Sequence, residues 1–269
     1  AFKMDGLGND FVIIDQRSQN YNLTKDQIIK ICDRNFIGCD QLIFIQNNNK
    51  KDAELEFYNS DGSISGACGN GTRCVADLLS KENNDKEIIL WTSSGALKSQ
   101  ILDNNLVETE IGVPKTNWNE IPLNKNLDTK NLNIKIVNKN NIEHIGGTSV
   151  NVGNPHVVFF VDNIEDYDLK KIGPEIENHN YFPEKCNVTL AKVISKTLIK
   201  VKVWERGAGL TKACGTAACA TAVASNINGL TDKKTDIEFA LGKLSITINE
   251  NNSIHMKGPV SDIKNIEIN

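Results

Sequence analysis

A short cysteine-containing turn occurs twice in this chain, and it constrains the fold more than any other feature. The copies are Ala67-Cys68-Gly69-Asn70-Gly71 and Ala213-Cys214-Gly215-Thr216-Ala217. Each copy precedes a run of small residues that predicts a helix, over residues 72–79 and 218–224. We therefore expect both cysteines at helix N-termini, in two folding units of similar design.

Four pairs of polar or reactive residues recur at a nearly constant interval. The pairs are Asn9 with Asn154, 145 residues apart, and Gln41 with Asn187 (or its neighbour Val188), Asn59 with Glu205 and Cys68 with Cys214, each 146 residues apart. A duplication of this kind predicts an α+β fold. We expect two similar domains related by a pseudo-two-fold axis, each a mixed β-sheet wrapped around a central helix, with the repeated motifs facing a common cleft.

The domain limits follow from the same repeat. We expect a first domain over residues 1–114 and a second over 115–259, with the Asn- and Pro-rich segment 114–128 as an irregular junction. A C-terminal strand over residues 260–269 is expected to pack back onto the first domain. Apolar patterns predict strands at 2–4, 11–15, 41–46, 52–58, 87–91, 95–102, 106–111, 132–137, 142–145, 157–161, 190–193, 197–204, 237–239, 243–248 and 253–257, and further helices at 24–35 and 169–178.

Composition excludes several classes of function. The net charge of -4 leaves no basic surplus to neutralise phosphates, so nucleic acid is not an expected partner. No apolar run approaches the length of a membrane span, and residues 1–5 lack a signal-peptide pattern, so we expect a cytoplasmic protein without a membrane partner. None of the seven cysteines has C-x-x-C spacing, so we expect no metal site, and Cys32, Cys74 and Cys219 are interpreted as buried packing residues.

The position of each repeated cysteine suits acid–base chemistry. A thiol at a helix N-terminus feels the positive end of the helix dipole, which favours the thiolate. The glycine that follows each cysteine leaves backbone N–H groups that can bind an anion. If Cys68 and Cys214 face each other, a substrate carboxylate binds between the helix ends, one thiolate removes the α-proton and the opposite thiol delivers another. This reaction inverts the α-carbon and needs no electron-sink cofactor.

Several motifs along the chain resemble the diaminopimelate epimerase family. They are Gly6-Leu7-Gly8-Asn9-Asp10-Phe11, Asn59-Ser60-Asp61-Gly62-Ser63, Cys68-Gly69-Asn70-Gly71-Thr72-Arg73, Gly153-Asn154-Pro155-His156, Glu205-Arg206-Gly207-Ala208-Gly209 and Ala213-Cys214-Gly215-Thr216. Asp5 and Cys39 depart from the family's pattern. The resemblance implies the diaminopimelate-epimerase-like fold and a cofactor-independent isomerase. Its reaction is the interconversion of LL- and meso-2,6-diaminopimelate, for lysine and peptidoglycan precursor synthesis.

The resemblance also implies a role for each site residue. Cys68 and Cys214 match the catalytic acid/base pair, and His156 and Glu205 match positions that tune the pKa values of the cysteines. The implied substrate-binding residues are Asn9, Gln41, Asn59, Gly69, Asn70, Asn154, Asn187, Glu205, Arg206, Gly215 and Thr216. Arg206 suits the distal carboxylate of an amino acid with two zwitterionic ends, because its planar fork can bind a carboxylate through two hydrogen bonds.

Other interpretations of the two cysteines stay open. A related racemase of the proline or hydroxyproline type has a similar two-cysteine design, although Arg206 favours an acyclic substrate. A thiol redox protein would cycle Cys68 and Cys214 through a disulfide, and a non-catalytic binder would hold an amino acid without turnover. In the plainest interpretation both thiols are inert packing groups. The partner is expected to be a small amino acid, and a homodimer is one option for the assembly.

Overall fold

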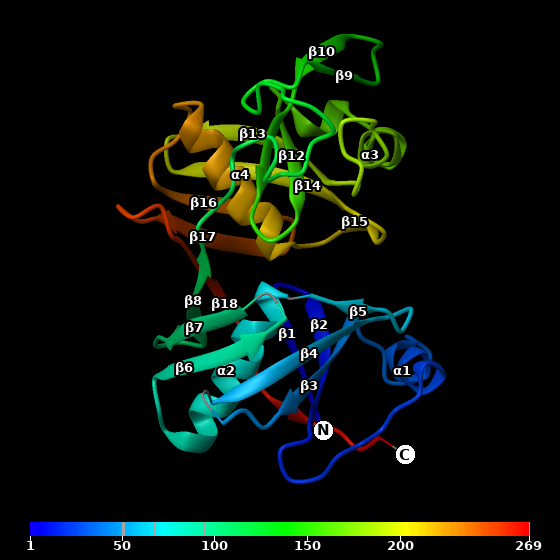
Figure 1. Ribbon diagram of the computed structural model, residues 1–269, viewed down its shortest axis with the longest axis vertical. Helices are drawn as coiled ribbons and strands as arrows, with labels where there is room; N and C mark the ends of the chain where they lie inside the picture. The colour runs from blue at the N-terminus through cyan, green and yellow to red at the C-terminus, as the bar shows by residue number, and fades with distance from the viewer. Residues whose placement is uncertain (50–51, 67, 94, 269) are drawn as a thin grey trace. The chain divides into compact units, whose positions relative to one another are not determined.

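The computed structural model describes residues 1–49, 52–66, 68–93 and 95–268. Ala67, the first residue of the first repeated turn, lies outside these residues. The chain divides into two compact units, Ala1–Glu110 with Lys257–Asn269, and Ile111–Met256 (Figure 1). The division therefore falls four residues before the expected limit at 114, and the C-terminal segment belongs to the first unit.

The first unit is a mixed sheet with two helices. Its elements are β1 (Phe2–Gly6), β2 (Asn9–Asp15), α1 (Lys25–Cys32), β3 (Gln41–Gln46), β4 (Ala53–Asn59), β5 (Ile64–Ser65), α2 (Gly69–Asn83), β6 (Glu87–Thr92), β7 (Gly95–Ile101), β8 (Leu106–Gly112) and β19 (Lys264–Asn265). β2 runs antiparallel to β1 and parallel to β3, and β4 runs antiparallel to β3 and parallel to β6. β19 pairs with β1, so the chain end completes this sheet.

The second unit begins with an additional two-stranded sheet and then repeats that order. Its elements are β9 (Ile134–Val137), β10 (Glu143–Gly146), β11 (Thr148–Asn151), β12 (Pro155–Phe160), η1 (Ile164–Asp166), α3 (Leu169–Glu177), β13 (Asn187–Ser195), β14 (Leu198–Glu205), β15 (Gly209–Thr211), α4 (Gly215–Ile227), β16 (Lys234–Phe239) and β17 (Gly242–Ile248). β12 runs antiparallel to β11 and parallel to β13, and β14 runs antiparallel to β13 and parallel to β16. β18 (Ile254–Pro259) returns the chain to the first unit.

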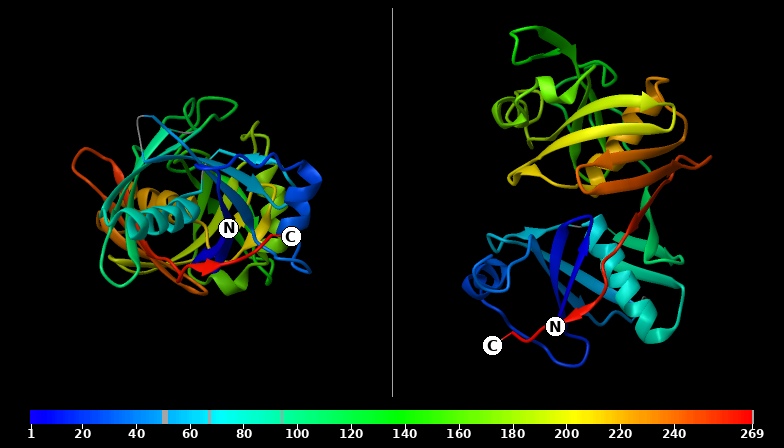
Figure 2. Two further views of the ribbon diagram at one scale, coloured as in Figure 1. Left: turned by 90° about the horizontal axis from the view of Figure 1, so that it is seen from below. Right: turned by 180° about the vertical axis from the view of Figure 1, so that it is seen from behind.

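The predicted α+β architecture, with a mixed sheet around one helix in each unit, is confirmed. α2 packs against β1, β2, β6 and β7, and α4 packs against β11, β12, β13, β16 and β17. Each of these helices lies against the sheet of its own unit (Figures 1 and 2). A strand is present at every predicted position, including β19 within the expected C-terminal strand 260–269; β5, β11 and β15 were not predicted.

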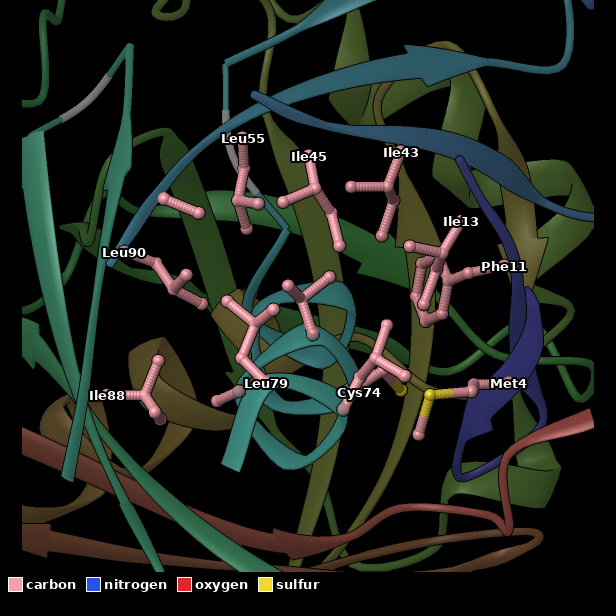
Figure 3. Packing of buried hydrophobic residues seen from close by; sticks show 14 of the residues in the cluster. Met4, Phe11, Ile13, Ile43, Ile45, Leu55, Cys74, Leu79, Ile88 and Leu90 are labelled. Atoms are coloured by element: carbon pink, nitrogen blue, oxygen red, sulfur yellow. The ribbon is translucent and has the colours of Figure 1, made fainter. Parts of the chain in front are cut away.

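Small residues let each central helix approach its sheet closely. In the first unit the buried residues of β2, β3, β4 and β6 surround Cys74 and Leu79 of α2 (Figure 3). A Cβ atom at Gly71 would lie 2.7 Å from Ile43 Cδ1 and 3.1 Å from Phe57 Cε1, so a larger residue there would force these core side chains to shift. In α4 the corresponding face is built from buried alanines. Cys32, Cys74 and Cys219 are buried, as expected for packing residues.

The segment expected to form the junction is part of a core instead. Ile121 and Leu123 are buried in the second unit, where the partly buried Trp118 packs against their cluster. The chain passes between the units within β8 and within β18. Among the described residues, no helix combines the length and the apolar character needed to cross a membrane.

Candidate active site

Both repeated cysteines are N-cap residues of the central helices, as the sequence predicted. Cys68 caps α2 with φ -140° and ψ 111°, and Cys214 caps α4 with φ -141° and ψ 117°. The helices begin at Gly69 and Gly215, three residues before the predicted starts. The first N–H groups of a helix have no acceptor within it, so each cysteine lies beside backbone donors that can bind a carboxylate.

The Cys68 group consists of Asn9, Gln41, Asn59, Cys68, Gly69 and Asn70. Cys68 is partly exposed, and its Sγ atom accepts a hydrogen bond from the backbone N–H of Gly71 at 3.5 Å. The same sulfur lies 3.7 Å from Asn9 Oδ1, and Asn70 Nδ2 donates to that oxygen at 3.2 Å. The structure thus brings Asn9 and Asn70 to the sulfur.

Gln41 and Asn59 lie on neighbouring strands of the same unit. Gln41 pairs with Phe11 in β2 and with Asn59 in β4. Its Nε2 atom donates to Asn59 Oδ1 at 2.9 Å, and Asn59 Nδ2 donates to Ser63 Oγ at 3.0 Å. These contacts fix the orientation of both amides. Ser63 is a member that the sequence did not identify, although it lies in the same turn as Asn59.

The Cys214 group consists of Asn154, His156, Asn187, Glu205, Arg206, Cys214, Gly215 and Thr216. Cys214 Sγ lies 3.4 Å from Thr216 Oγ1 and is hydrogen-bonded to the side chain of Glu205. Burial, together with the negative charge of Glu205, raises the pKa of the Cys214 thiol well above its ordinary value, although the bond with Thr216 opposes this. Cys214 is therefore held as a thiol.

Four further members of the Cys214 group lie within hydrogen-bonding distance of one another. His156 is completely buried, and its Nε2 atom lies 2.8 Å from Asn154 Oδ1. Asn187 Nδ2 lies 3.3 Å from both His156 Nε2 and the carbonyl oxygen of Pro155. The backbone N–H of Arg206 donates to Asn187 Oδ1 at 2.8 Å. Every predicted residue of this group except Gly215 therefore has a side-chain or main-chain contact with another member of the group.

Burial controls the protonation of His156. Burial and the positive charge of Arg206 lower the pKa of His156 to about 3. The imidazole is therefore neutral near pH 7 and acts as a hydrogen-bonding group. Its Nδ1 atom has no hydrogen-bond partner among the described residues. The arrangement with a proton on Nε2, donated to Asn154, leaves only an acceptor unpaired, which costs less than a buried unpaired donor. Asn187 Nδ2 then donates to the carbonyl oxygen of Pro155 and not to His156.

The strand registers fix how the two groups correspond. Phe11 pairs with Gln41 between β2 and β3, and His156 pairs with Asn187 between β12 and β13. Asn187, rather than Val188, is therefore the counterpart of Gln41. The groups differ in charge, because Glu205 stands where the first unit has Asn59. No cluster of three or more His, Cys, Asp or Glu that could hold a metal ion occurs among the described residues.

Comparison with known sequences gives long matches. The family model described as diaminopimelate epimerase matches residues 1–116 and 148–263. A diaminopimelate epimerase from Pelagibacter ubique is 76% identical over 268 residues, which cover 100% of this chain and 98% of the relative. The diaminopimelate epimerase from Phenylobacterium zucineum is 42% identical over 260 residues, with 96% and 94% covered.

Comparison with solved structures identifies the same type of fold. A predicted epimerase from Pseudomonas aeruginosa aligns with a TM-score of 0.69 and 14% identity, over 100% of this chain and 99% of the other. A hydroxyproline epimerase from Agrobacterium vitis, with bound trans-4-hydroxy-L-proline, aligns with a TM-score of 0.66 and 13% identity, over 98% and 89%. At these identities the likeness establishes the fold alone.

Proposed function

This chain belongs to the diaminopimelate epimerase family, and on that premise we propose that it interconverts LL- and meso-2,6-diaminopimelate by a two-base reaction. One observation carries the proposal above all. Two cysteines cap the central helices of two units with the same topology, and their backbone conformations differ by no more than a few degrees. Two equivalent acid–base groups are what inversion of a carbon centre needs, because protons leave and arrive on opposite faces.

In the proposed reaction Cys68 and Cys214 act on opposite faces of the α-carbon at the reacting end of the substrate. The N–H groups of Gly69 and Asn70, and of Gly215 and Thr216, donate to the α-carboxylate. Negative charge grows on that carboxylate as the α-proton leaves, and preorganised donors stabilise it; one such donor is typically worth about 10²–10³ in rate. The reaction proceeds without an electron-sink cofactor.

The two sulfurs exchange roles with the direction of the reaction. A thiolate on one side takes the α-proton and becomes a thiol, while the thiol on the other side gives its proton to the opposite face and becomes a thiolate. Cys214 has the carboxylate of Glu205 beside it, which favours its thiol form. The corresponding residue of the first unit is the neutral Asn59. This difference in charge supports Cys68 as the thiolate and Cys214 as the thiol of the resting enzyme.

The remaining members select the substrate. Arg206 Nη1 donates to the carbonyl oxygen of Glu184 at 2.7 Å, which anchors the guanidinium on an exposed loop. The rest of its fork binds the distal carboxylate, and the amides of Asn9, Asn154 and Asn187 pair with the polar ends of the amino acid. The proposal includes a cytoplasmic role in lysine and peptidoglycan precursor synthesis.

The test is conversion of a pure stereoisomer. Purified protein is incubated separately with LL-diaminopimelate, L-proline and trans-4-hydroxy-L-proline, and stereoisomers are separated by chiral chromatography. We expect meso-diaminopimelate to form from the first substrate until equilibrium, with both cyclic amino acids unchanged. Turnover of proline or hydroxyproline without turnover of diaminopimelate would replace this proposal by the racemase alternative.

A further inference from the structure

A line of side chains connects the first catalytic cysteine to an ion pair near the surface. Arg73 Nη2 donates to Asn70 Oδ1 at 2.8 Å, and Asn70 Nδ2 donates to Asn9 Oδ1 at 3.2 Å. Asn9 Nδ2 then donates to Asp40 Oδ2 at 3.1 Å, and Asp40 Oδ1 accepts from Arg34 at 2.5 Å. Asp40 and Arg34 were not identified from the sequence, although Asp40 directly precedes Gln41.

The ends of this line determine the orientation of both amides. Arginine has only donors and an ionised aspartate has only acceptors. Arg73 therefore requires the oxygen of Asn70 on its side, which turns the Asn70 nitrogen toward Asn9. Asp40 requires the nitrogen of Asn9, which turns the Asn9 oxygen toward Cys68 Sγ, 3.7 Å away. A rotated Asn9 amide would break its contacts with both Asn70 and Asp40.

Asp40 is itself held in place. Arg34 binds Asp10 through two hydrogen bonds of 2.6 and 2.8 Å while it contacts Asp40. Burial alone would raise the pKa of Asp10, but Arg34 and Lys3 hold it below its ordinary value, so Asp10 stays ionised and retains Arg34. The backbone N–H of Asp10 also donates to Asp40 Oδ2 at 3.3 Å. The carboxylate of Asp40, which accepts the hydrogen bond from Asn9, is therefore held by both Arg34 and the backbone of Asp10.

We propose that Asp40, supported by Arg34, is a positioning residue that keeps the carbonyl oxygen of Asn9 directed at Cys68. The carbonyl oxygen accepts the S–H of Cys68 whenever that cysteine carries the proton, and so stabilises the thiol that forms when the resting thiolate of Cys68 takes the α-proton. The inverted amide would offer N–H to the sulfur and favour the thiolate. The assignment of Cys68 as a catalytic residue rests on the proposed function; the orientation of Asn9 does not.

The second unit has no carboxylate at the position equivalent to Asp40. The residue 146 positions after Asp40 is Cys186, which is buried and donates to the carbonyl oxygen of Ile176 at 3.5 Å. Asn154, the counterpart of Asn9, is held by His156 instead. The Asp40 contact is thus specific to the Cys68 side of the protein.

The experiment compares two substitutions of the same carboxylate. Asp40→Ala removes the negative charge and the acceptor. Asp40→Asn removes the same charge but keeps an oxygen that can accept a hydrogen bond from Asn9 Nδ2. Arg34 remains hydrogen-bonded to Asp10 in both variants. The pH dependence of alkylation of Cys68 by iodoacetamide is measured by peptide mass spectrometry, so no substrate is needed. Glu87→Ala, which removes an exposed carboxylate paired with Lys98 in the same unit, is the matched control.

We expect the midpoint of Cys68 alkylation to be lower in Asp40→Ala than in Asp40→Asn by about 0.5–1 pH unit, the scale of one hydrogen bond. Glu87→Ala should match the wild type. Where diaminopimelate turnover is established, kcat should fall about tenfold in Asp40→Ala and clearly less in Asp40→Asn. Equal midpoints in the two Asp40 variants would overturn the proposal, since charge alone would then explain them. Asp40→Ser, too short to reach Asn9, replaces the alanine variant if that variant does not fold.

Discussion

Cys214 shares a hydrogen bond with the carboxylate of Glu205, whereas the position equivalent to Glu205 in the first unit is the amide of Asn59. The two cysteines have the same place in their helices but different electrostatic surroundings. The backbone therefore supplies the symmetry that a two-base reaction uses, and the exchange of Glu205 for Asn59 is one difference between the two proposed bases.

Glu205→Gln should lower the pKa of Cys214. Burial remains in the variant, but the negative charge that disfavours the thiolate is gone. Alkylation of Cys214, followed against pH by peptide mass spectrometry, should shift to lower pH than in the wild type. Glu175→Gln, an exposed position on α3, should leave the profile unchanged. An identical profile for Glu205→Gln and the wild type would contradict the electrostatic role of Glu205.

Arg206→Lys should weaken substrate binding more than it slows the chemical step. Lysine keeps the charge but cannot hold a carboxylate through two parallel hydrogen bonds. We expect KM for diaminopimelate to rise about tenfold, the effect of about 1.4 kcal/mol, with a smaller change in kcat. Arg17→Lys, at the Asp15 and Glu82 ion pairs, provides the matched control. A KM that is unchanged in Arg206→Lys would refute the distal-carboxylate role.

His156 should make the protein less stable at mildly acidic pH. Its pKa is about 3 in the folded protein and about 6.5 in an unfolded chain, so the unfolded state binds the extra proton between these values. The contribution of neutral His156 to the free energy of unfolding is complete above pH 6.5. As the pH falls below that value, this contribution decreases by about 1.4 kcal/mol per pH unit. Urea unfolding at pH 7 and pH 5 should show a larger loss of stability for the wild type than for His156→Gln. Equal losses would show that His156 is charged when folded.

Gly71→Ala should destabilise the protein although alanine is the better helix former. The new Cβ would lie 2.7 Å from Ile43 Cδ1 and 3.1 Å from Phe57 Cε1. Overpacking of this kind costs about 1–3 kcal/mol, which exceeds the gain of up to about 1 kcal/mol in helix propensity. The midpoint of thermal unfolding should therefore fall. The second unit has Ala217 at the equivalent position, so Ala217→Gly is the reciprocal control, and a higher midpoint for Gly71→Ala would contradict the packing argument.

The repeat explains why so much of the fold could be predicted. When the sequence pattern predicts the position of a residue in one unit, the repeat predicts the position of its counterpart in the other. The sequence therefore predicts Cys68 and Cys214 at helix N-termini, and the structure confirms both positions. The domain limit was harder to predict, because Ile121 and Leu123 are buried without a helical or strand period. The two-residue strand β5 is too short to show alternation.

The polar partners were the least predictable part of the site. Asp40 and Arg34 look like ordinary surface charges in the sequence, and only the folded chain brings them to Asn9 and Asp10. The neutrality of His156 depends in the same way on tertiary burial. The motifs identified the candidate site residues, but they carried little information on what holds those residues in place.

The central claim is that Cys68 and Cys214 are the two bases. Exchange of the α-hydrogen of LL-diaminopimelate in D2O, followed by NMR and mass spectrometry, tests it most directly, with Cys219→Ala as a buried-cysteine control. We predict that the wild type and Cys219→Ala form meso product labelled at the inverted carbon. Cys68→Ala and Cys214→Ala should form no meso product, and the double variant should exchange no α-hydrogen. Product from either single variant, or exchange in the double variant, would contradict the two-base account.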